Sequence, residues 1–342
     1  MFRFNFDIDE TIDDGKTTPD LDRQHATITP QPFSEIPLDT LLRALPPKIS
    51  HSSLTIPLPD GNALTFARRD LFDARFQLIS EGTEDYESPE QAEFESALQF
   101  LDNPSDLVPL VYEGGLKTWE CSLDLVTYLS GINYRVNPTS TRILEIGCGT
   151  AIPTLYILYN IFSSPPVSGN EIHIHLQDYN TSVLGIVTIP NIILTWYHSP
   201  AAETYRSHEL NDSGESELNI TPQLLEDFKE SLKIYGINIR VFSGSWDTFD
   251  LGTSGGAYDV VLTSETIYCL DSLPGLVRLM CNACVAERHL CLVAAKVVYF
   301  GVGGGVPEFM RCVEEASQQA RVDTVLEKKA GVNTRVMSVQ WV

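Results

Sequence analysis

The chain of 342 residues has few cysteines and no long apolar segment. Seven cysteines in a chain of this length do not form a disulfide framework, so we expect buried, reduced thiols. The N-terminus has neither the cationic leader nor the apolar core of a signal peptide. No apolar run approaches the length of a membrane span. These absences predict a protein of the cytoplasm and nucleus.

Basic residues are also scarce, with 23 Lys and Arg against 46 Asp and Glu, which gives a net charge of -23. Such a surface repels nucleic acid and anionic membranes and attracts basic proteins. We therefore expect a basic protein as partner and no direct contact with nucleic acid or membrane. Solubility alone is an equally simple explanation of the charge. We also expect a monomer.

Motifs for metal or phosphate binding are incomplete. Cys281 and Cys284 have the spacing of a zinc pair but lack a second pair, which favours packing on a helix. His173 and His175 alternate on one predicted strand without an acidic partner. Residues 303–305 are three glycines that lack the Lys and Ser/Thr of a P-loop, so a flexible turn is favoured. The sequence predicts no metal.

The most informative stretch, residues 142–151, reads Arg-Ile-Leu-Glu-Ile-Gly-Cys-Gly-Thr-Ala. It has the pattern of a buried strand that opens into a glycine turn. Gly147 and Gly149 let the backbone turn sharply and approach a ligand closely. A second strand ends at Asp178, whose carboxylate can accept both hydroxyls of a ribose. Together they predict a nucleotide-type cofactor at the edge of a parallel sheet.

The turn favours S-adenosylmethionine over a dinucleotide. The third glycine of the dinucleotide pattern is replaced by Ile152. Glu145 would repel a pyrophosphate, whereas an acidic neighbourhood suits the ammonium group of S-adenosylmethionine. A purely structural turn between strand and helix is the alternative.

Strands alternate with helices from residue 107 onward, which requires a parallel sheet with covered faces. We expect seven strands, at residues 142–146, 172–176, 237–242, 258–263, 290–295, 322–328 and 335–341. We expect helices at residues 119–129, 153–162, 182–187, 222–235, 273–285 and 307–318. The fold class is α/β, a mostly parallel, doubly wound, Rossmann-like sheet of seven strands.

The remaining segments predict three further regions. Residues 1–30 form an acidic arm that we expect to be disordered, although the aromatic start at Phe2, Phe4 and Phe6 could dock as an edge strand. Residues 31–106 are an irregular N-terminal extension of mixed structure. Within it, prolines make residues 46–60 irregular, residues 64–79 suggest strands, and residues 89–100 a helix. Residues 199–221 form a mobile surface insertion in the domain 107–342.

The loops that follow the first five strands hold polar and aromatic residues that sheet packing does not require. Trp246 is suited to cover an adenine face. Ser264 and Glu265 lie at the tip of the fourth strand, where a group would face the transferred methyl. Each residue alone has an ordinary explanation in turn or cap chemistry. Five such loops at one sheet edge favour a binding site.

Five motifs resemble the family of protein-histidine N-methyltransferases related to methyltransferase-like protein 18. The resemblance covers most of residues 107–342, and the aromatic start is similar as well. The motifs lie at residues 113–122, 144–149, 176–180, 263–268 and 295–305. Ala151 departs from the third glycine that many methyltransferases carry there.

The resemblance implies a seven-strand S-adenosylmethionine-dependent enzyme that methylates a histidine in a large-subunit ribosomal protein, with S-adenosylhomocysteine as product. The turn itself adds Glu145 and Gly149 to the cofactor residues that the resemblance implies. Those residues are Thr118, Trp119, Glu120, Cys121, Ser122, Gly147, Gln177, Asp178, Tyr179, Gly244, Ser245, Trp246 and Ser264.

Histidine is a suitable acceptor because its reference pKa of about 6.5 leaves it mostly neutral at pH 7. Lysine, with a pKa of about 10.4, would first have to lose a proton at a cost of about 4–5 kcal/mol. Glu265 is our candidate to bind Nδ1–H and leave Nε2 as the nucleophile, and Tyr268 to orient the ring. The rivals are a lysine methyltransferase, whose acid-x-x-aromatic motif the spacing of Glu265 and Tyr268 resembles, and a non-catalytic escort of a basic ribosomal protein.

Overall fold

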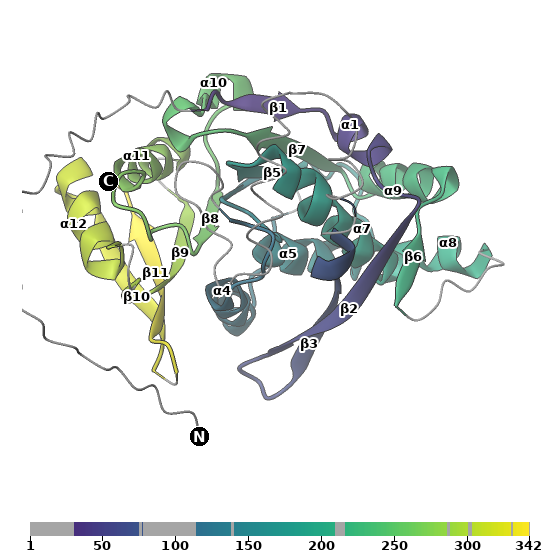
Figure 1. The fold of residues 1–342 in the computed structure, drawn as a ribbon, viewed down its shortest axis with the longest axis horizontal. Helices are drawn as coiled ribbons and strands as arrows, with labels where there is room; N and C mark the ends of the chain where they lie inside the picture. The colour runs from purple at the N-terminus through teal and green to yellow at the C-terminus, as the bar shows by residue number, and fades with distance from the viewer. Residues whose placement is uncertain are drawn as a thin grey trace, which may run out of the picture.

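The computed structural model describes residues 31–74, 77, 114–137, 140–208, 216–285, 288–299, 303–329 and 331–341. An eight-stranded sheet in the order β1-β7-β5-β4-β8-β9-β11-β10 forms its centre (Figure 1). The inner strands β7, β5, β4, β8 and β9 are parallel, whereas β1, β11 and β10 each run antiparallel to their inward neighbour. The strands span Ser34–Ile36 (β1), Thr141–Ile146 (β4), Ile172–Asp178 (β5), Ile237–Ser243 (β7), Val260–Ser264 (β8), Leu290–Lys296 (β9), Arg321–Lys328 (β10) and Thr334–Gln340 (β11).

All seven predicted strands are present, and β1 extends the sheet by an eighth. Alternate residues of one strand enter two separate apolar cores. In β4, Ile143 packs into the first core, and Leu144 and Ile146 into the second. This burial on both faces explains why the inner strands are nearly continuous apolar runs.

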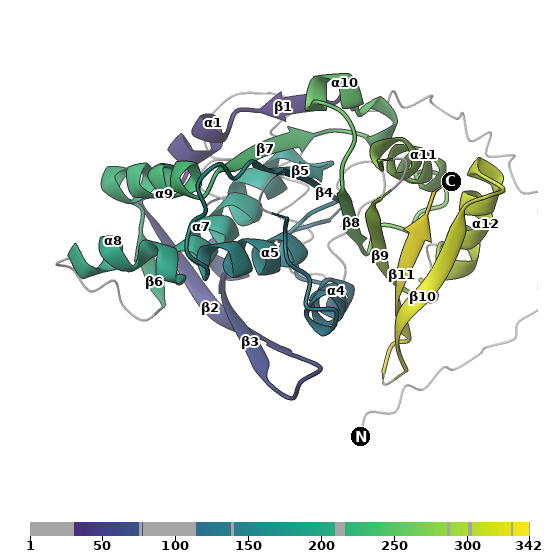
Figure 2. The same ribbon diagram turned by 180° about the vertical axis from the view of Figure 1, so that it is seen from behind.

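Helices cover both faces of the sheet. The first core includes residues of α4 (Glu120–Gly131), α5 (Ile152–Phe162), α7 (Ile189–Tyr197) and α9 (Pro222–Ile234). The second includes residues of α11 (Leu273–Ala283) and α12 (Val306–Ala316). Figure 2 shows α12 beside β10 and β11 at one end of the molecule and α9 toward the other. The short helices are α1 (Leu38–Arg43), α6 (Thr181–Val183), α8 (Glu203–His208) and α10 (Leu251–Ser254).

A second sheet joins the N-terminal extension to the insertion. The hairpin β2 (Lys48–Pro57) and β3 (Ala63–Arg69) pairs with β6 (Glu217–Asn219) in the order β3-β2-β6. The prediction of irregular backbone at residues 46–60 was therefore wrong. Prolines flank β2, but residues 48–56 contain none, and Ile49 and Ile56 are fully buried.

The prediction of a loop at residues 199–221 was also wrong where the structure describes that segment. It contains α8 and β6, and Leu218 of β6 is fully buried. The predicted helix at residues 182–187 was too short, since α6 continues through a π-helix (Leu184–Thr188) into α7. Helix α7 is buried almost all round, so it lacks the polar face that reveals a helix in a sequence. The predictions for residues 1–30 and 89–100 lie outside the described residues.

The order of the strands reverses at β4: the chain continues to β5 and β7 on one side of β4 and then returns to β8 on the other side. In open α/β sheets, ligands bind outside the carboxyl ends of the strands at such a switch point. The glycine turn after β4 lies at this position. None of the helices in the described residues combines the length and the apolar composition of a membrane span.

Candidate active site

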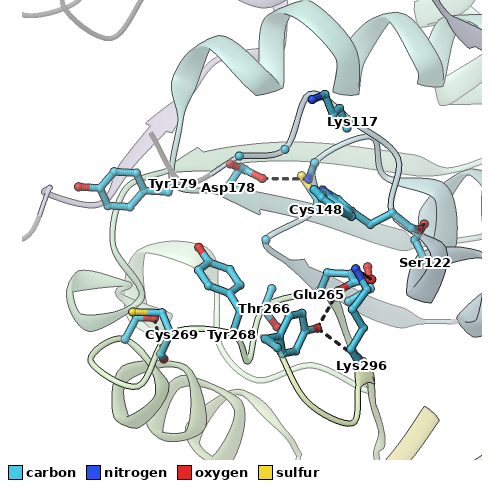
Figure 3. Close-up of a pocket in the computed structure, with 18 of the residues that line it drawn as sticks. Lys117, Ser122, Cys148, Asp178, Tyr179, Glu265, Thr266, Tyr268, Cys269 and Lys296 are labelled. Atoms are coloured by element: carbon cyan, nitrogen blue, oxygen red, sulfur yellow. Dashed lines mark hydrogen bonds and ion pairs between the residues drawn. The ribbon is translucent and has the colours of Figure 1, made fainter. Parts of the chain in front are cut away.

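A cavity of about 950 Å³ opens at the carboxyl ends of the parallel strands (Figure 3). Eleven of the predicted site residues line it: Trp119, Ser122, Gly147, Gly149, Asp178, Tyr179, Ser245, Trp246, Ser264, Glu265 and Tyr268. Six do not: Thr118, Glu120, Cys121, Glu145, Gln177 and Gly244. The structure thus brings loops from five strand ends and the start of α4 around one space.

The turn after β4 approaches the cavity in left-handed backbone conformations. Gly147, Gly149 and Ala151 have φ angles of +60°, +49° and +58°. Ala151 therefore adopts the strained conformation that a glycine would adopt freely. A Cβ on Gly147 would lie 2.6 Å from Cγ2 of Thr266 and 3.7 Å from the Trp246 ring, and both residues line the cavity. This part of the cavity therefore requires glycine.

Asp178 connects the end of β5 to this turn. Its Oδ2 accepts a hydrogen bond from Gly149 N at 2.9 Å, and its Oδ1 accepts one from Asn180 N at 3.2 Å. The residue is only 5% exposed yet lines the cavity. The carboxylate is therefore fixed in orientation beside the open space.

Gln177, in β5, joins the loops after β4 and β7 from outside the cavity. Its Nε2 donates to Gly244 O at 2.7 Å, while its Oε1 accepts from Gly147 N at 3.2 Å and from Trp246 Nε1 at 2.9 Å. Gly244 is in turn packed so closely that a Cβ would lie 2.4 Å from the carbonyl oxygen of Pro32. Both residues position the Trp246 loop rather than face the cavity.

The side chain of Glu145 turns away from the cavity. It accepts hydrogen bonds from Thr154 N at 3.0 Å and Thr154 Oγ1 at 2.5 Å, within the first turn of α5. Burial raises the pKa of this carboxyl to about 8, while its bonds to Thr154 oppose the shift. Glu145 therefore supports the start of α5. The sequence predicted that its carboxylate would lie near an ammonium group in the cavity, and this geometry does not provide that contact.

Residues just before α4 and in its first turn contribute in part to the cavity and in part to its support. Trp119 and Ser122 line it. The hydroxyl of Thr118 donates a hydrogen bond to the hydroxyl of Thr150 at 3.1 Å. Cys121 N donates a hydrogen bond to Oε1 of Glu265 at 3.4 Å. The segment thereby connects the glycine turn with the loop after β8.

Glu265, in the cavity wall, is held by its backbone conformation and by several contacts. Its φ angle of +58° is left-handed, which is costly for a residue with a side chain. Its Oε2 accepts a hydrogen bond from the Tyr299 hydroxyl at 2.7 Å, and its Oε1 lies 3.6 Å from Lys296 Nζ. Burial, and then the charge of Glu265, raise the pKa of Tyr299 well above its usual value, so Tyr299 remains a donor.

Several curated proteins are similar to the chain, among them the following three. Histidine protein methyltransferase 1 of Schizosaccharomyces pombe is 35% identical over 80% of this chain and 74% of that protein. The protein of the same name from Saccharomyces cerevisiae is 34% identical over 71% and 67%. A homologue from Bos taurus is 35% identical over 62% and 51%. No family model matches the chain.

The chain belongs to the histidine protein methyltransferase 1 family. It is an S-adenosylmethionine-dependent methyltransferase, as the sequence predicted. The glycine turn that the sequence predicted after β4 lies in the wall of the cavity.

The cavity fits S-adenosylmethionine in size and in the chemistry of its wall. The space beside Gly147, which a Cβ would fill, leaves room for close approach to the backbone. Asp178 would hold the ribose hydroxyls, and Trp246, fixed through Gln177, would pack beside the adenine. When bound, the cofactor supplies an electrophilic methyl group.

Substitution of Asp178 by Ala is expected to weaken binding of S-adenosylhomocysteine at least tenfold. Two charge-assisted hydrogen bonds to the ribose would be lost, each worth about 1.5–3 kcal/mol. Isothermal titration calorimetry measures the affinity. Asp178→Asn is the matched control, because it keeps an oxygen that can accept from Gly149 N but loses the charge. An unchanged affinity in the Ala variant would contradict the role of Asp178.

Two important residues, Lys296 and Tyr299, were not predicted as site residues. Both lie where β9 ends, and both contact Glu265. The sequence had singled out the loop that contains them, after the fifth predicted strand, but had assigned none of its residues to the site. Neither the spacing nor the residue types revealed which carboxylate they would bind.

The three glycines at residues 303–305 are closely packed, rather than a flexible turn. Gly304 N donates to Tyr268 O at 3.0 Å, and Gly304 O accepts from Tyr299 N at 3.1 Å. A Cβ on Gly304 would lie 2.3 Å from the carbonyl oxygens of Ile267 and Tyr268. This segment therefore joins the loop after β8 to the loop after β9.

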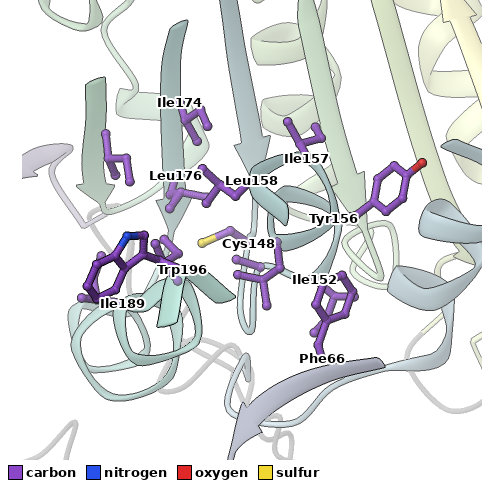
Figure 4. Close-up of a cluster of buried hydrophobic side chains, with 14 of the residues drawn as sticks. Phe66, Cys148, Ile152, Tyr156, Ile157, Leu158, Ile174, Leu176, Ile189 and Trp196 are labelled. Atoms are coloured by element: carbon purple, nitrogen blue, oxygen red, sulfur yellow. The ribbon is translucent and has the colours of Figure 1, made fainter. Parts of the chain in front are cut away.

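Cys148 contributes its backbone to the cavity and its side chain to the first core. Figure 4 shows its sulfur among apolar side chains of that core, including Leu176 and Leu158. Burial raises the pKa of the thiol well above its usual value, so it is not a nucleophile. Within the described part of the chain, no group of three or more His, Cys, Asp or Glu residues is arranged to hold a metal ion.

Proposed function

We propose that the enzyme methylates Nε2 of a histidine in a basic protein, namely a protein of the large ribosomal subunit. The carboxylate of Glu265, at the tip of β8 in the cavity wall, is the observation that carries this proposal. The names of the relatives support histidine as acceptor. The ribosomal target comes from the family resemblance of the sequence motifs.

Glu265 selects the nucleophilic nitrogen in this proposal. A carboxylate has about four lone-pair positions, so Glu265 retains acceptor capacity beyond its bonds to Tyr299 and to Cys121 N. A hydrogen bond from Nδ1–H of the target histidine fixes the tautomer in which Nε2 carries the free lone pair. The same carboxylate stabilises the positive charge that the ring gains when the N–C bond forms.

The walls of the cavity provide alignment and exclude water. Trp119, Tyr268 and Tyr299 give it aromatic surfaces, and the ring centroids of Tyr268 and Tyr299 lie 6.3 Å apart. Tyr268 is placed to orient the imidazole. Alignment of two reactants contributes about 7–11 kcal/mol to such reactions, so no metal is needed.

Product analysis tests the proposed function. Ribosomal proteins from cells that lack the gene are incubated with the enzyme and labelled S-adenosylmethionine, then hydrolysed for amino-acid analysis. Label in Nε2-methylhistidine is expected, and it should coincide with the methylation that mass spectrometry finds missing in those cells. Label in methyllysine would favour the lysine rival, and cofactor binding without any transfer would favour an escort.

The acidic surface of the chain is expected to accelerate capture of a basic substrate. Methylation of ribosomal proteins at low substrate concentration should slow as sodium chloride rises from about 10 mM to physiological strength, because the Debye length falls from about 30 to 8 Å. Initial rates measure the effect. The control is the affinity for S-adenosylhomocysteine, which should change much less. A rate that is independent of salt would contradict charge steering.

A further inference from the structure

Lys296 lies in a cage that is suited to an ammonium group. Its Nζ is 4.5 Å from the ring centroid of Trp119 and 5.8 Å from that of Tyr299. The same atom is 3.5 Å from Oε2 of Glu120 and 3.6 Å from Oε1 of Glu265. The side chain is only 16% exposed. Aromatic faces and two carboxylates thus surround one cation beside the cavity. Figure 3 shows Lys296 next to Glu265 in the cavity wall.

This arrangement is the one that would recognise the ammonium of a lysine acceptor. Cations bind aromatic faces within about 6 Å, and a carboxylate adds a direct countercharge. That carboxylate belongs to Glu265, which together with Tyr268 has the acid-x-x-aromatic spacing that resembles the motif of lysine methyltransferases. Here the chain itself supplies the ammonium, from the end of β9.

We propose that Lys296 determines acceptor specificity by occupying the ammonium cage with the chain's own cation. It holds Glu265 in place and excludes lysine as the acceptor. This inference rests on the proposed function, because it explains why the site takes histidine.

The charges around Glu265 give the physical reason. The Glu265 side chain is 8% exposed, and a buried carboxylate without a cation is costly. With Lys296 present, a cation balances the charge of Glu265, and the second carboxylate of the cage, Glu120, is 66% exposed to water. Glu265 then presents a hydrogen-bond acceptor to a neutral imidazole N–H rather than an unbalanced charge to an ammonium. Without Lys296 the same carboxylate would attract an incoming ammonium. The Tyr299 hydroxyl holds the other oxygen in either case.

Substitution of Lys296 by Ala empties the cage and allows chemical rescue. The truncated side chain lacks a fragment equivalent to propylammonium, which serves as the probe. Lys296→Met fills the same space with an uncharged chain and should not respond to the probe. Lys233→Ala is the matched control, because Lys233 pairs with Glu230 on α9 and its side chain is 75% exposed.

The assay measures methylhistidine and methyllysine in ribosomal proteins from cells that lack the gene, at pH 9 so that lysine can lose its proton. For Lys296→Ala we expect methylhistidine to fall at least tenfold and methyllysine to appear. Propylammonium chloride should then reverse both changes, whereas sodium chloride at equal ionic strength should not. The Lys233→Ala enzyme should match the unmodified enzyme.

Three results would overturn the proposal. The first is normal histidine methylation by Lys296→Ala, and the second is no response of that variant to propylammonium. The third is that propylammonium restores methylhistidine although the variant made no methyllysine without the probe. Melting temperature and S-adenosylhomocysteine binding show whether the variant is folded. If Lys296→Ala does not fold, Lys296→Met carries the test, and unchanged histidine methylation by it would overturn the proposal. The proposed function fails separately, if the unmodified enzyme itself makes methyllysine.

Discussion

Replacing Gly147 with Val is expected to abolish binding of S-adenosylhomocysteine, and methylation with it. Its φ angle of +60° is strained for a β-branched residue, and a Cβ would lie 2.6 Å from Cγ2 of Thr266. Thr266 cannot easily move, because its hydroxyl bonds that of Thr263 at 2.7 Å. Overpacking costs about 1–3 kcal/mol and such backbone strain a further 1–3 kcal/mol. Together these costs are about 2–6 kcal/mol, so we expect affinity to fall at least about 30-fold, since each tenfold is about 1.4 kcal/mol.

Gly169→Val separates strain from contact. Gly169 has a similar left-handed φ of +83°, but a Cβ there would meet nothing within 4 Å. It should lower the melting temperature through backbone strain and leave cofactor affinity intact. Calorimetric titration of both variants decides the matter. Normal binding by Gly147→Val would mean that the turn does not approach the cofactor.

Local patterns were sufficient to predict the centre of the fold. The inner strands are buried on both faces, so each is a short apolar run that ends at a polar loop. The carboxyl ends of parallel strands meet at one edge, which is why Asp178 and Glu265 could be assigned to one cavity from their positions alone. The alternation of side chains along β4 would also have predicted that Glu145 points away from the cavity. Glu145 lies on the same face of the strand as Ile143, and Ile143 packs into the first core.

Contacts between distant segments could not be predicted in this way. Strand β2 pairs with β6 through Lys48 and Asn219, so its stability depends on a segment far along the chain. The approach of Lys296 and Tyr299 to Glu265 likewise depends on how two loops are packed by the glycines at residues 303–305. A sequence shows that each of these residues follows a strand, but side-chain direction is set by the assembled structure.

Substitution of Glu265 by Gln is expected to slow histidine methylation by about 10²–10⁴-fold, the range for a positioned acid–base group. The amide keeps the size of the side chain but loses the charge that pairs with Lys296 and that stabilises the imidazolium. Binding of S-adenosylhomocysteine should remain nearly normal, because Glu265 acts on the acceptor. Single-turnover rates with labelled S-adenosylmethionine and ribosomal proteins measure the loss.

Glu230→Gln provides the matched control, since it makes the same change in a carboxylate that binds Lys233 on the surface. Its rate should equal that of the unmodified enzyme. If cofactor affinity or melting temperature fell in step with the rate of Glu265→Gln, Glu265 would be a structural or cofactor residue instead. The position of the methyl group is the sharper criterion: Nε2 agrees with a bond from Nδ1–H to Glu265, and methyl on Nδ1 would require the opposite tautomer and refute that bond.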